Sequence, residues 1–380
     1  MKRKSIVFLI ALVLILSGCQ SGNQHVKKRK KEHKHQNKIE NKYDKRHHKD
    51  EKNLVEYDGK VSHVFFHPII SDPQKAYTDN QQQAKGNYDW MVTVNEFNKA
   101  IEKLHENNYI LIDPHDAYDL ESTPVKRKKL KLPKGKKPLI MSMDDMNYYE
   151  YMQGNGYTER LTLNKDNETV AEKKNDQGKM EQSKTNDAVP LLNDYVKKHP
   201  DFSYKGQKAV VGLTGYEGVL GYRTNDLEHP NYEKRKKQAK KVADSMKRDG
   251  WTFASHSYGH INFEDSSDEQ IIEDTKRWKK EVEPIVGKTD LFIFPHGAQD
   301  RNSTSYNYMI DEAGFKYMAG VGPDNFTSLS NKDIYQDRVA IDGLNLHQFK
   351  YKLKPFFKPE EVYNKEDRQY YKGNKDYEIE

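Results

Sequence analysis

Short apolar runs alternate with amphipathic and polar stretches along the body of this chain. The β-like runs cover 61–70, 110–112, 138–143, 209–213, 251–255, 291–294, 316–321 and 338–341, and helical patterns cover 93–107, 188–198, 232–248, 266–282 and 303–313. Two helix-opening capping boxes are expected, Thr93 with Glu96 and Ser266 with Glu269. Strands separated by helices indicate mostly parallel pairing with right-handed crossovers.

The number of strands narrows the fold class, which is α/β. About seven parallel strands favour a distorted (β/α) barrel, and an open doubly wound sheet fits the pattern nearly as well. In both folds the chemistry belongs at the carboxyl ends of the strands.

A long polar excursion interrupts the alternation after residue 147. Within it, Leu161-Thr-Leu and Glu168-Thr-Val alternate around Asn164-Lys-Asp-Asn, which is typical of a β-hairpin. We therefore assign 148–187 to an inserted hairpin within a catalytic domain that spans 56–350, and 351–380 to a polar C-terminal tail.

The first residues indicate the compartment. Lys2, Arg3 and Lys4 precede an apolar run that ends at Leu16-Ser17-Gly18-Cys19, so 1–18 has the pattern of a signal peptide. Small residues before a cysteine resemble the lipobox of bacterial lipoproteins, which implies a lipid thioether on Cys19. A spanning helix is disfavoured, because the apolar run has about 11 residues where roughly 20 are needed. We expect the protein to be anchored through Cys19 to the extracellular face of the bacterial cell membrane.

The stretch 19–55 is almost wholly polar and rich in histidine. It cannot bury enough apolar surface to offset its ordering entropy, so we expect a disordered tether. The leader carries three positive charges and 20–50 carries 11 basic against 4 acidic residues, which leaves about −4 of the total +6 for the rest. Nucleic-acid binding is therefore not expected. The cations suit anionic lipid or wall polymer, a solvated spacer is the plainer alternative, and the histidines could scavenge metal.

Two clusters of polar residues follow apolar runs and suggest hydrolase chemistry. Asp144 and Asp145 follow 138–143, and His256 and His260 follow 251–255 with a glycine between them. One carboxylate and two imidazoles would form a three-ligand metal site with an open position, which leaves the other carboxylate free as a base. Cys19 is the only cysteine, so thiolate ligands and a thiol nucleophile are excluded. The HExxH zinc-protease pattern does not fit, because residue 257 is Ser and residue 259 is Gly.

At these motifs the sequence resembles the polysaccharide deacetylases, the NodB-homology group or carbohydrate esterase family 4. Their Thr-Phe-Asp-Asp-Gly motif is similar to Ser142-Met143-Asp144-Asp145-Met146, and their His-Ser/Thr-x-x-His motif matches His256-Ser257-Tyr258-Gly259-His260. Their Arg-x-Pro-x-Gly motif is matched in part by Ile293-Phe294-Pro295-His296-Gly297. The resemblance spans roughly residues 60 to 350 and implies a distorted barrel that removes N-acetyl groups from amino sugars.

The resemblance also implies roles for individual residues. Asp145, His256 and His260 would bind a divalent metal, for which we expect Zn²⁺, and Asp144 would be the general base. Such a metal activates water and polarises the acetamide carbonyl, so the unligated carboxylate is needed to take the proton. A backbone N–H near His296 would stabilise the oxyanion.

The sequence departs from the family pattern at several positions. Met146 replaces a glycine, and Ile293 replaces the arginine that orients the base, which leaves Asp144 without that partner. The general acid is expected to be His347, in Leu344-Asn345-Leu346-His347, with His296 as the competing candidate. Asp337 and Arg338 could hold the imidazole of the acid, although a surface ion pair is the plainer interpretation.

Substrate contacts are expected from Pro295 and Gly297 of the third motif and from Tyr216 and Tyr222 in a glycine-rich loop, whereas Trp251 suits the core. The predicted substrate is a cell-wall or extracellular amino-sugar polymer: peptidoglycan, poly-N-acetylglucosamine or a chitin-like chain. The alternative is a carbohydrate-binding lipoprotein that keeps the fold without turnover. We expect a monomer whose partners are the polysaccharide and the membrane.

Overall fold

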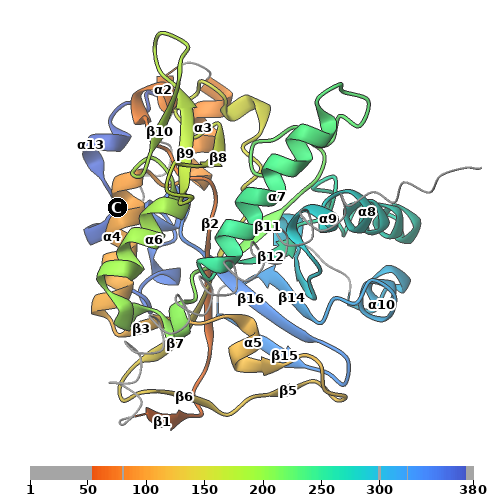
Figure 1. Cartoon of the computed structure of the whole chain (residues 1–380). Coiled ribbons are helices and arrows are strands. Elements are labelled where there is room, and N and C mark those ends of the chain that lie inside the picture. Colours follow the sequence, from red (N-terminus) through yellow and green to blue (C-terminus); the bar gives the residue numbers. More distant parts are fainter. Residues whose placement is uncertain (1–53, 79–80, 298–300, 323, 374–380) are drawn as a thin grey trace, which may run out of the picture. The chain divides into compact units, whose positions relative to one another are not determined.

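The computed structural model describes residues 54–78, 81–297, 301–322 and 324–373 (Figure 1). The predicted signal peptide, the lipidation site Cys19 and nearly all of the predicted tether lie outside these residues. Within the described ranges, no helix has both the length and the apolar character needed to cross a bilayer.

Seven parallel strands form a closed barrel in the described part of the chain. They are β2 (Ser62–Phe66), β7 (Lys137–Met143), β11 (Val210–Leu213), β12 (Thr252–Ser255), β13 (Leu291–Ile293), β14 (Tyr317–Val321) and β16 (Ile334–Ala340). Each pairs with the next in that order, and β16 pairs with β2. The pairing of Val210 with Ser142 joins β11 to β7, and this contact makes the fold a barrel and not an open sheet. The predicted α/β barrel is confirmed.

Helices surround the barrel in the order that the sequence pattern predicts (Figure 1). The longer ones are α3 (Gln81–Trp90), α4 (Val94–Glu106), α6 (Ala188–Lys198), α7 (Tyr232–Arg248), α8 (Asp268–Glu281) and α10 (Thr304–Asp311). Shorter ones are α2 (Pro73–Thr78), α5 (Pro114–Ala117), α9 (Glu283–Val286), α11 (Gly343–His347), α12 (Pro359–Val362) and α13 (Lys365–Arg368).

The two predicted capping boxes have different outcomes. Thr93 and Glu96 cap α4 reciprocally, as predicted. At α8 the prediction is wrong by one residue, because Ser267 and Gln270 form the capping box. Ser266 and Ser267 can each act as the N-cap, and Glu269 and Gln270 can each complete the capping box. The sequence alone therefore does not decide which pair forms it.

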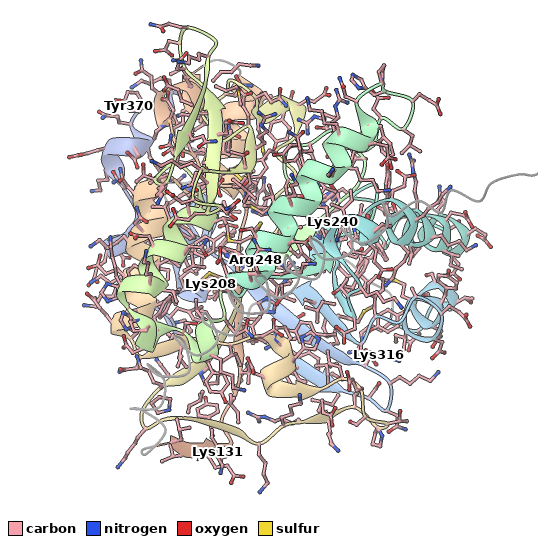
Figure 2. All side chains as sticks on the ribbon, in the orientation of Figure 1. Lys131, Lys208, Lys240, Arg248, Lys316 and Tyr370 are labelled. Atoms are coloured by element: carbon pink, nitrogen blue, oxygen red, sulfur yellow. The ribbon has the colours of Figure 1, made fainter. Side chains whose placement is uncertain are left out.

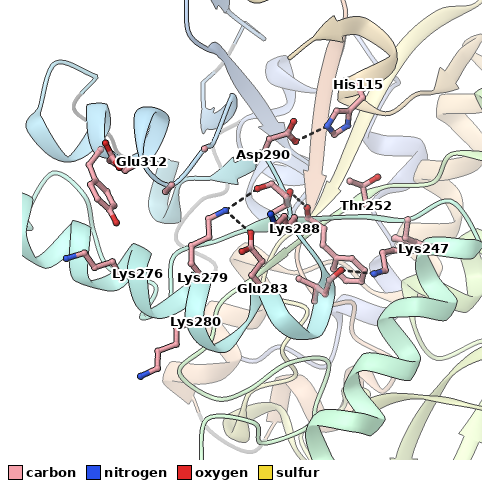
Figure 3. Close-up of a pocket in the computed structure, with 17 residues that line it drawn as sticks. His115, Lys247, Thr252, Lys276, Lys279, Lys280, Glu283, Lys288, Asp290 and Glu312 are labelled. Carbon is pink, nitrogen blue, oxygen red and sulfur yellow. Dashed lines mark hydrogen bonds and ion pairs between the residues drawn. The ribbon is translucent and has the colours of Figure 1, made fainter. Parts of the chain in front are cut away.

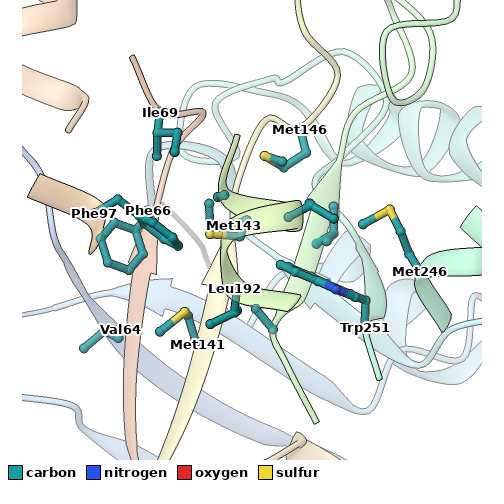
Figure 4. Close-up of a cluster of buried hydrophobic side chains, with 14 of the residues drawn as sticks. Val64, Phe66, Ile69, Phe97, Met141, Met143, Met146, Leu192, Met246 and Trp251 are labelled. Carbon is teal, nitrogen blue, oxygen red and sulfur yellow. The ribbon is translucent and has the colours of Figure 1, made fainter. Parts of the chain in front are cut away.

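The main core lies between the outer face of the barrel and its helices. Outward residues of β2 and β7, among them Phe66 and Met143, pack there with Phe97 of α4 and Trp251 (Figure 4). Met146, which follows the acidic pair, is fully buried in the same cluster. Since neighbouring residues of a strand face opposite sides, Phe65 and Ser142 point into the barrel.

The barrel interior holds a polar network below the acidic pair. The ring nitrogens of His63 lie 2.9 Å from the hydroxyl of Tyr317 and 3.0 Å from the hydroxyl of Ser142. Arg338 donates to the same Ser142 oxygen at 3.1 Å. Burial, assisted by Arg338, lowers the pKa of His63 well below its ordinary value, so this imidazole is neutral. The network satisfies buried polar groups and fixes the side chains that lead up to the site.

The inserted segment contains the predicted hairpin and one more strand. β8 (Arg160–Leu163), β9 (Thr169–Lys174) and β10 (Met180–Ser183) form an antiparallel sheet in the order β10-β9-β8. Four further short strands, β1 (Leu54–Tyr57), β4 (Tyr118–Asp119), β5 (Lys126–Arg127) and β6 (Leu130–Pro133), form two small ribbons. β3 (Tyr109–Leu111) and β15 (Thr327–Leu329) pair with β7 and β16, respectively, outside the ring.

The prediction of a polar tail from 351 onward is wrong, because the described part of this segment packs into the domain. Arg368 of α13 is 2% exposed and donates to both carboxylate oxygens of Glu96, at 2.7 and 2.8 Å, and to the carbonyls of Tyr88 and Met91. The N-terminal boundary also shifts, since β1 begins at Leu54. The segment has many charged residues and was therefore expected to be solvated, but its cation Arg368 is buried and paired with Glu96.

Helix α7 is strongly basic, yet its cations lie away from the core. Lys240 and Arg248, labelled in Figure 2, are exposed, whereas Ala239 and Met246 are buried. Lys208, which precedes β11 and is not part of α7, differs from these cations because it is only 3% exposed. Its ammonium donates to the carbonyls of Gly206 and Asp249 at 2.7 and 2.6 Å, and burial lowers its pKa to about 8.

Candidate functional site

Three predicted metal ligands from distant parts of the chain meet at the carboxyl ends of β7 and β12. The Nε2 atoms of His256 and His260 lie 3.9 and 3.7 Å from the two carboxylate oxygens of Asp145. One ligand atom from each residue lies within 4.8 Å of the others. In the described ranges this is the one cluster of three or more His, Cys, Asp or Glu side chains with such spacing.

The orientation of His256 is fixed from behind. Its backbone N–H continues the β12 pairing by donating to the carbonyl of Leu213 at 3.0 Å, and its Nδ1 lies 2.9 Å from the carbonyl of Ile293. Because a carbonyl only accepts, Nδ1 carries a proton, and Nε2 is the ring nitrogen that faces Asp145. This is the arrangement of a histidine that ligates a metal through Nε2.

Asp145 is held by a tyrosine that the sequence analysis did not single out. The hydroxyl of Tyr149 donates to Oδ1 of Asp145 at 2.5 Å and lies 2.8 Å from the hydroxyl of Thr214. Burial, and then the charge of Asp145, raise the pKa of Tyr149 well above its ordinary value, so the phenol remains a donor. Burial of Asp145 opposes its ionisation, but His256 and His260 outweigh that effect and hold its pKa below the ordinary value.

Left-handed backbone conformations gather at the site. Asp145, Ser257, His260 and His296 have φ values of 58°, 57°, 52° and 57°. Such conformations are uncommon for residues with a Cβ and are retained where the surroundings fix them. The turn at Asp145 separates its side chain from that of the adjacent Asp144, so two neighbouring carboxylates can have different surroundings.

The three side chains fit a divalent cation. Ligands about 2.0–2.1 Å from a tetrahedral metal are roughly 3.3 Å apart, and the observed separations of 3.7 and 3.9 Å exceed this by only a few tenths of an ångström. Burial lowers the pKa of His260, which favours the neutral form that binds metal. When bound, such a cation would polarise a carbonyl and lower the pKa of a water molecule.

Asp144 has an arginine partner, which corrects the expectation drawn from Ile293. Nη1 of Arg338 lies 2.7 and 2.8 Å from the two carboxylate oxygens of Asp144, and neither side chain exceeds 3% exposure. Burial disfavours the charged carboxylate, but Arg338 outweighs it and holds the pKa of Asp144 below its ordinary value. The predicted surface ion pair of Asp337 with Arg338 is therefore wrong, because Arg338 is buried in the barrel.

Arg338 could have been found from strand alternation. The sequence pattern predicts a strand over 338–341, whereas β16 begins at Ile334. Over the full strand, Gln336 and Arg338 share the inward face, while Tyr335 and Val339 belong to outward hydrophobic clusters. A polar residue on the inward face at the carboxyl end of a barrel strand is a signal of function.

His67 is a further histidine that the motif analysis missed. It follows β2 at the same end of the barrel and is partly buried. Its Nδ1 lies 3.0 Å from the carbonyl of Trp90, and its ring meets Phe65 edge-on, with centroids 5.6 Å apart. Its only sequence signal is that it is a polar residue inside the predicted β-like run 61–70, which no family motif marks.

The third predicted motif lies beside the metal cluster. The ring of His296 is 4.7 Å from that of His260, centroid to centroid, and His296 is exposed. Pro295 is buried. Gly297 has φ 71°, and a Cβ there would lie 2.5 Å from Cβ of Val321, so the position requires glycine.

His347 lies in different surroundings. It ends α11, and its ring neighbours are Tyr88, with centroids 5.3 Å apart, and Tyr363, with centroids 6.2 Å apart. Burial is the main cause that lowers the pKa of His347, and the charges that also influence it, Arg368, Asp89, Lys350 and Lys85, lie outside the metal cluster. The structure does not bring His347 together with Asp145, His256 and His260.

The predicted substrate-binding tyrosines fall in two classes. Tyr216 is 38% exposed and stacks on Tyr149, with ring centroids 5.1 Å apart. Tyr151, which is 42% exposed, also stacks on Tyr149, with ring centroids 6.0 Å apart. Tyr222, in contrast, is 5% exposed and packs in the main core, so it offers no exposed aromatic face for the predicted substrate contact.

A large pocket of about 1050 Å³ opens at the other end of the barrel (Figure 3). It is lined by residues at the amino ends of strands, including Thr252 and Asp290. Two ion pairs lie within its lining: His115 with Asp290 at 2.8 Å and Lys279 with Glu283 at 2.8 Å. The cluster of Asp145, His256 and His260 lies at the opposite, carboxyl ends of the strands.

One comparison with known proteins, a match to a family model, agrees with the site. A family model described as polysaccharide deacetylase matches residues 224–318, about a quarter of the chain, which include His256, His260 and the third motif but not the acidic pair. No curated protein matches the chain. The match supports a polysaccharide deacetylase, and hence an enzyme.

Two solved structures are similar over most of the chain. Streptococcus pyogenes deacetylase PplD, solved in complex with acetate, is 15% identical, with 80% of this chain and 99% of PplD covered and a TM-score of 0.46. IcaB from Ammonifex degensii is 12% identical, with 74% and 91% covered and a TM-score of 0.41. Both TM-scores lie below 0.5, so neither likeness contributes to the functional assignment.

Proposed function

We propose that this protein is a metal-dependent N-deacetylase of an amino-sugar polymer. The observation that carries the proposal is the convergence of Asp145, His256 and His260 beside a separate buried carboxylate, Asp144. An amide carbonyl bound at the cation would be polarised, and Asp144 would take the proton of the attacking water. The role of Asp144 requires the ionised form, which Arg338 favours.

The remaining predicted contacts complete the proposed site. A backbone N–H near His296 would stabilise the developing oxyanion. Exposed Tyr216 and Tyr151 flank Tyr149, which holds Asp145, so two aromatic faces are available beside the metal cluster for a sugar ring. Pro295 and Gly297 shape the same rim.

The substrate and the location are part of the proposal. Peptidoglycan, poly-N-acetylglucosamine and chitin-like chains all carry the acetamide that such a site would hydrolyse. The lipobox-like residues before Cys19 favour a lipid-anchored, extracellular enzyme with a polar leash that suits an immobile polymer. Incorporation of labelled palmitate by the wild type, and its loss in Cys19→Ala, would support the anchor.

The non-catalytic alternative rested on two features, the lack of an arginine partner for Asp144 and the uncertain identity of the general acid. Arg338 supplies that partner, so this reason no longer favours a protein without turnover. Acetate release from oligomers of N-acetylglucosamine and from peptidoglycan tests the proposal. We expect release by the wild type, at least a 100-fold loss in Asp144→Asn and loss on chelation. Binding of the oligomers without release would contradict the proposed activity.

A further inference from the structure

The proposed reaction needs one more group than the site has so far supplied. Hydrolysis of an acetamide forms a C–O bond from water to the carbonyl carbon and breaks the C–N bond, whose electron pair stays on nitrogen. Asp144 takes the water proton, but the departing amine must also receive a proton, since an amide anion is too basic to leave. His347, the predicted donor, lies among Tyr88 and Tyr363 and not at the metal cluster.

The geometry points to His67 as the proton donor, an inference that rests on the proposed function. His67 directly follows β2, which is the neighbour of β7 in the barrel. Phe66 pairs with Met143, and the N–H of Asp144 donates to the carbonyl of Phe66 at 2.9 Å. His67 therefore follows the residue that fixes the backbone of the base.

The side chain of His67 shares the inward face of β2. Phe66 points outward into the main core, so Phe65 and His67 point to the opposite side. The ring of Phe65 lies 4.2 Å from the guanidinium carbon of Arg338, which holds Asp144, and the ring of His67 packs edge-on against Phe65. A short chain of contacts thus joins His67 to the base.

One ring nitrogen of His67 is fixed, which leaves the other for chemistry. Nδ1 lies 3.0 Å from the carbonyl of Trp90, and a carbonyl only accepts, so Nδ1 carries a proton in both charge states. The proton that is gained and lost is therefore on Nε2. Trp90 is 50% exposed, which places this support at the rim where a polymer could approach.

The electrostatics of the site agree with this placement. Burial is the largest influence on the pKa of Asp144 and of Asp145 and raises both, and His67 is among the charges that lower them. His67 also lowers the pKa of His260, for which burial is the main cause. The imidazole thus interacts with the base and with two of the metal ligands.

In the proposed step, Nε2–H of His67 donates its proton to the amide nitrogen as the C–N bond breaks. The products are acetate and a free amino sugar, and the neutral imidazole regains a proton from solvent. His67 is then a catalytic residue, because Nε2 contacts the reacting nitrogen.

The test compares two leaving groups in His67→Asn. The asparagine amide can still donate to the carbonyl of Trp90, whereas the atom corresponding to Nε2 is lost. An N-acetylglucosamine oligomer needs a protonated leaving group, but an aryl acetate such as 4-nitrophenyl acetate does not. We expect acetate release from the oligomer to fall at least about 100-fold, aryl acetate hydrolysis to stay within about 3-fold, and zinc affinity to be unchanged.

Other outcomes would overturn the assignment. Equal losses on both substrates would make His67 a structural residue, and full activity on the oligomer would remove it from the reaction. His67→Gln must show the same substrate split, which guards against a folding defect in one variant. A 100-fold loss on the oligomer alone in His347→Gln would restore His347 as the donor. If the wild type hydrolyses neither substrate, the proposed function itself fails.

Discussion

Arg338 on β16 holds Asp144 at the end of β7 through contacts of 2.7 and 2.8 Å, although 193 residues of sequence lie between them. Both side chains are buried, so each charge depends on the other. Arg338 takes the place of the family arginine that Ile293 replaces, and it reaches Asp144 from β16 and not from β13. The base of the proposed reaction is thus ionised and oriented by the barrel interior.

Separating this pair is expected to destabilise the fold and to abolish activity. Arg338→Met leaves a buried carboxylate unpaired, so the free energy of unfolding should fall by about 3–5 kcal/mol. Adding Asp144→Asn removes the uncompensated charge, so the double variant should regain much of that loss while acetate release stays absent. Urea unfolding of the two single variants and the double variant measures the coupling, and simple additivity of the two effects would contradict a direct pair.

The hydroxyl of Tyr149 is expected to tune metal binding. Tyr149→Phe removes the donor to Oδ1 of Asp145 while the ring stack with Tyr216 is preserved. Loss of such a supporting contact typically weakens metal affinity about 10–100-fold. Titration calorimetry with zinc would measure this, with Tyr151→Phe as the matched variant in which the affinity should not change. Equal affinities in Tyr149→Phe and the wild type would contradict the role.

A buried carboxyl group away from the site predicts a dependence of stability on pH. Burial raises the pKa of Asp187, the N-cap of α6, to about 6, compared with 3.8 for the free side chain. The folded state therefore binds more protons than the unfolded state between these values, and stability is lost as pH rises from 4 through 6. A shift of about two pKa units corresponds to roughly 3 kcal/mol.

Asp187→Asn tests that prediction, because asparagine also caps helices and carries no charge. The stability of the variant relative to the wild type should increase between pH 4 and pH 7.5, as measured by urea midpoints. A difference that is the same at both pH values would show that the raised pKa of Asp187 does not contribute.

Substitution of the exposed tyrosine is expected to separate substrate size from chemistry. Tyr216→Ala removes an aromatic face beside the cluster, so kcat/KM for long oligomers should fall about 10-fold, in the range of about 1–3 kcal/mol that burying an aromatic side chain provides. Hydrolysis of a small aryl acetate should change little. Tyr222→Phe, at a buried position, is the comparison, and an equal loss on both substrates in Tyr216→Ala would contradict a subsite.

The sequence was sufficient to predict most helices and strands, but not to predict that the strands close into a barrel. Helices α6 and α7 match the predicted ranges because their apolar faces are regular and their ends are marked by Asp187 and by Gly250. The choice between a barrel and an open sheet depends on the pairing of β7 with β11, a contact between distant segments that local patterns do not encode.

The same limit applies to the site. The spacing of His256 and His260 and the acidic pair were enough to predict the cluster, since each motif is local. Arg338 and His67 lie in no motif, and their relevance follows only from the inward faces of β16 and β2. Arg368 was missed for a related reason, because its charge suggested solvent although Glu96 pairs with it inside the domain.

The central claim is that Asp145, His256 and His260 hold one divalent cation. Crystals of the domain grown with Zn²⁺ and measured at the zinc absorption edge would test it most directly. We predict a single strong anomalous peak about 2.0–2.2 Å from a carboxylate oxygen of Asp145 and from Nε2 of both histidines. A zinc peak bound elsewhere, with these three side chains left without metal, would contradict the account.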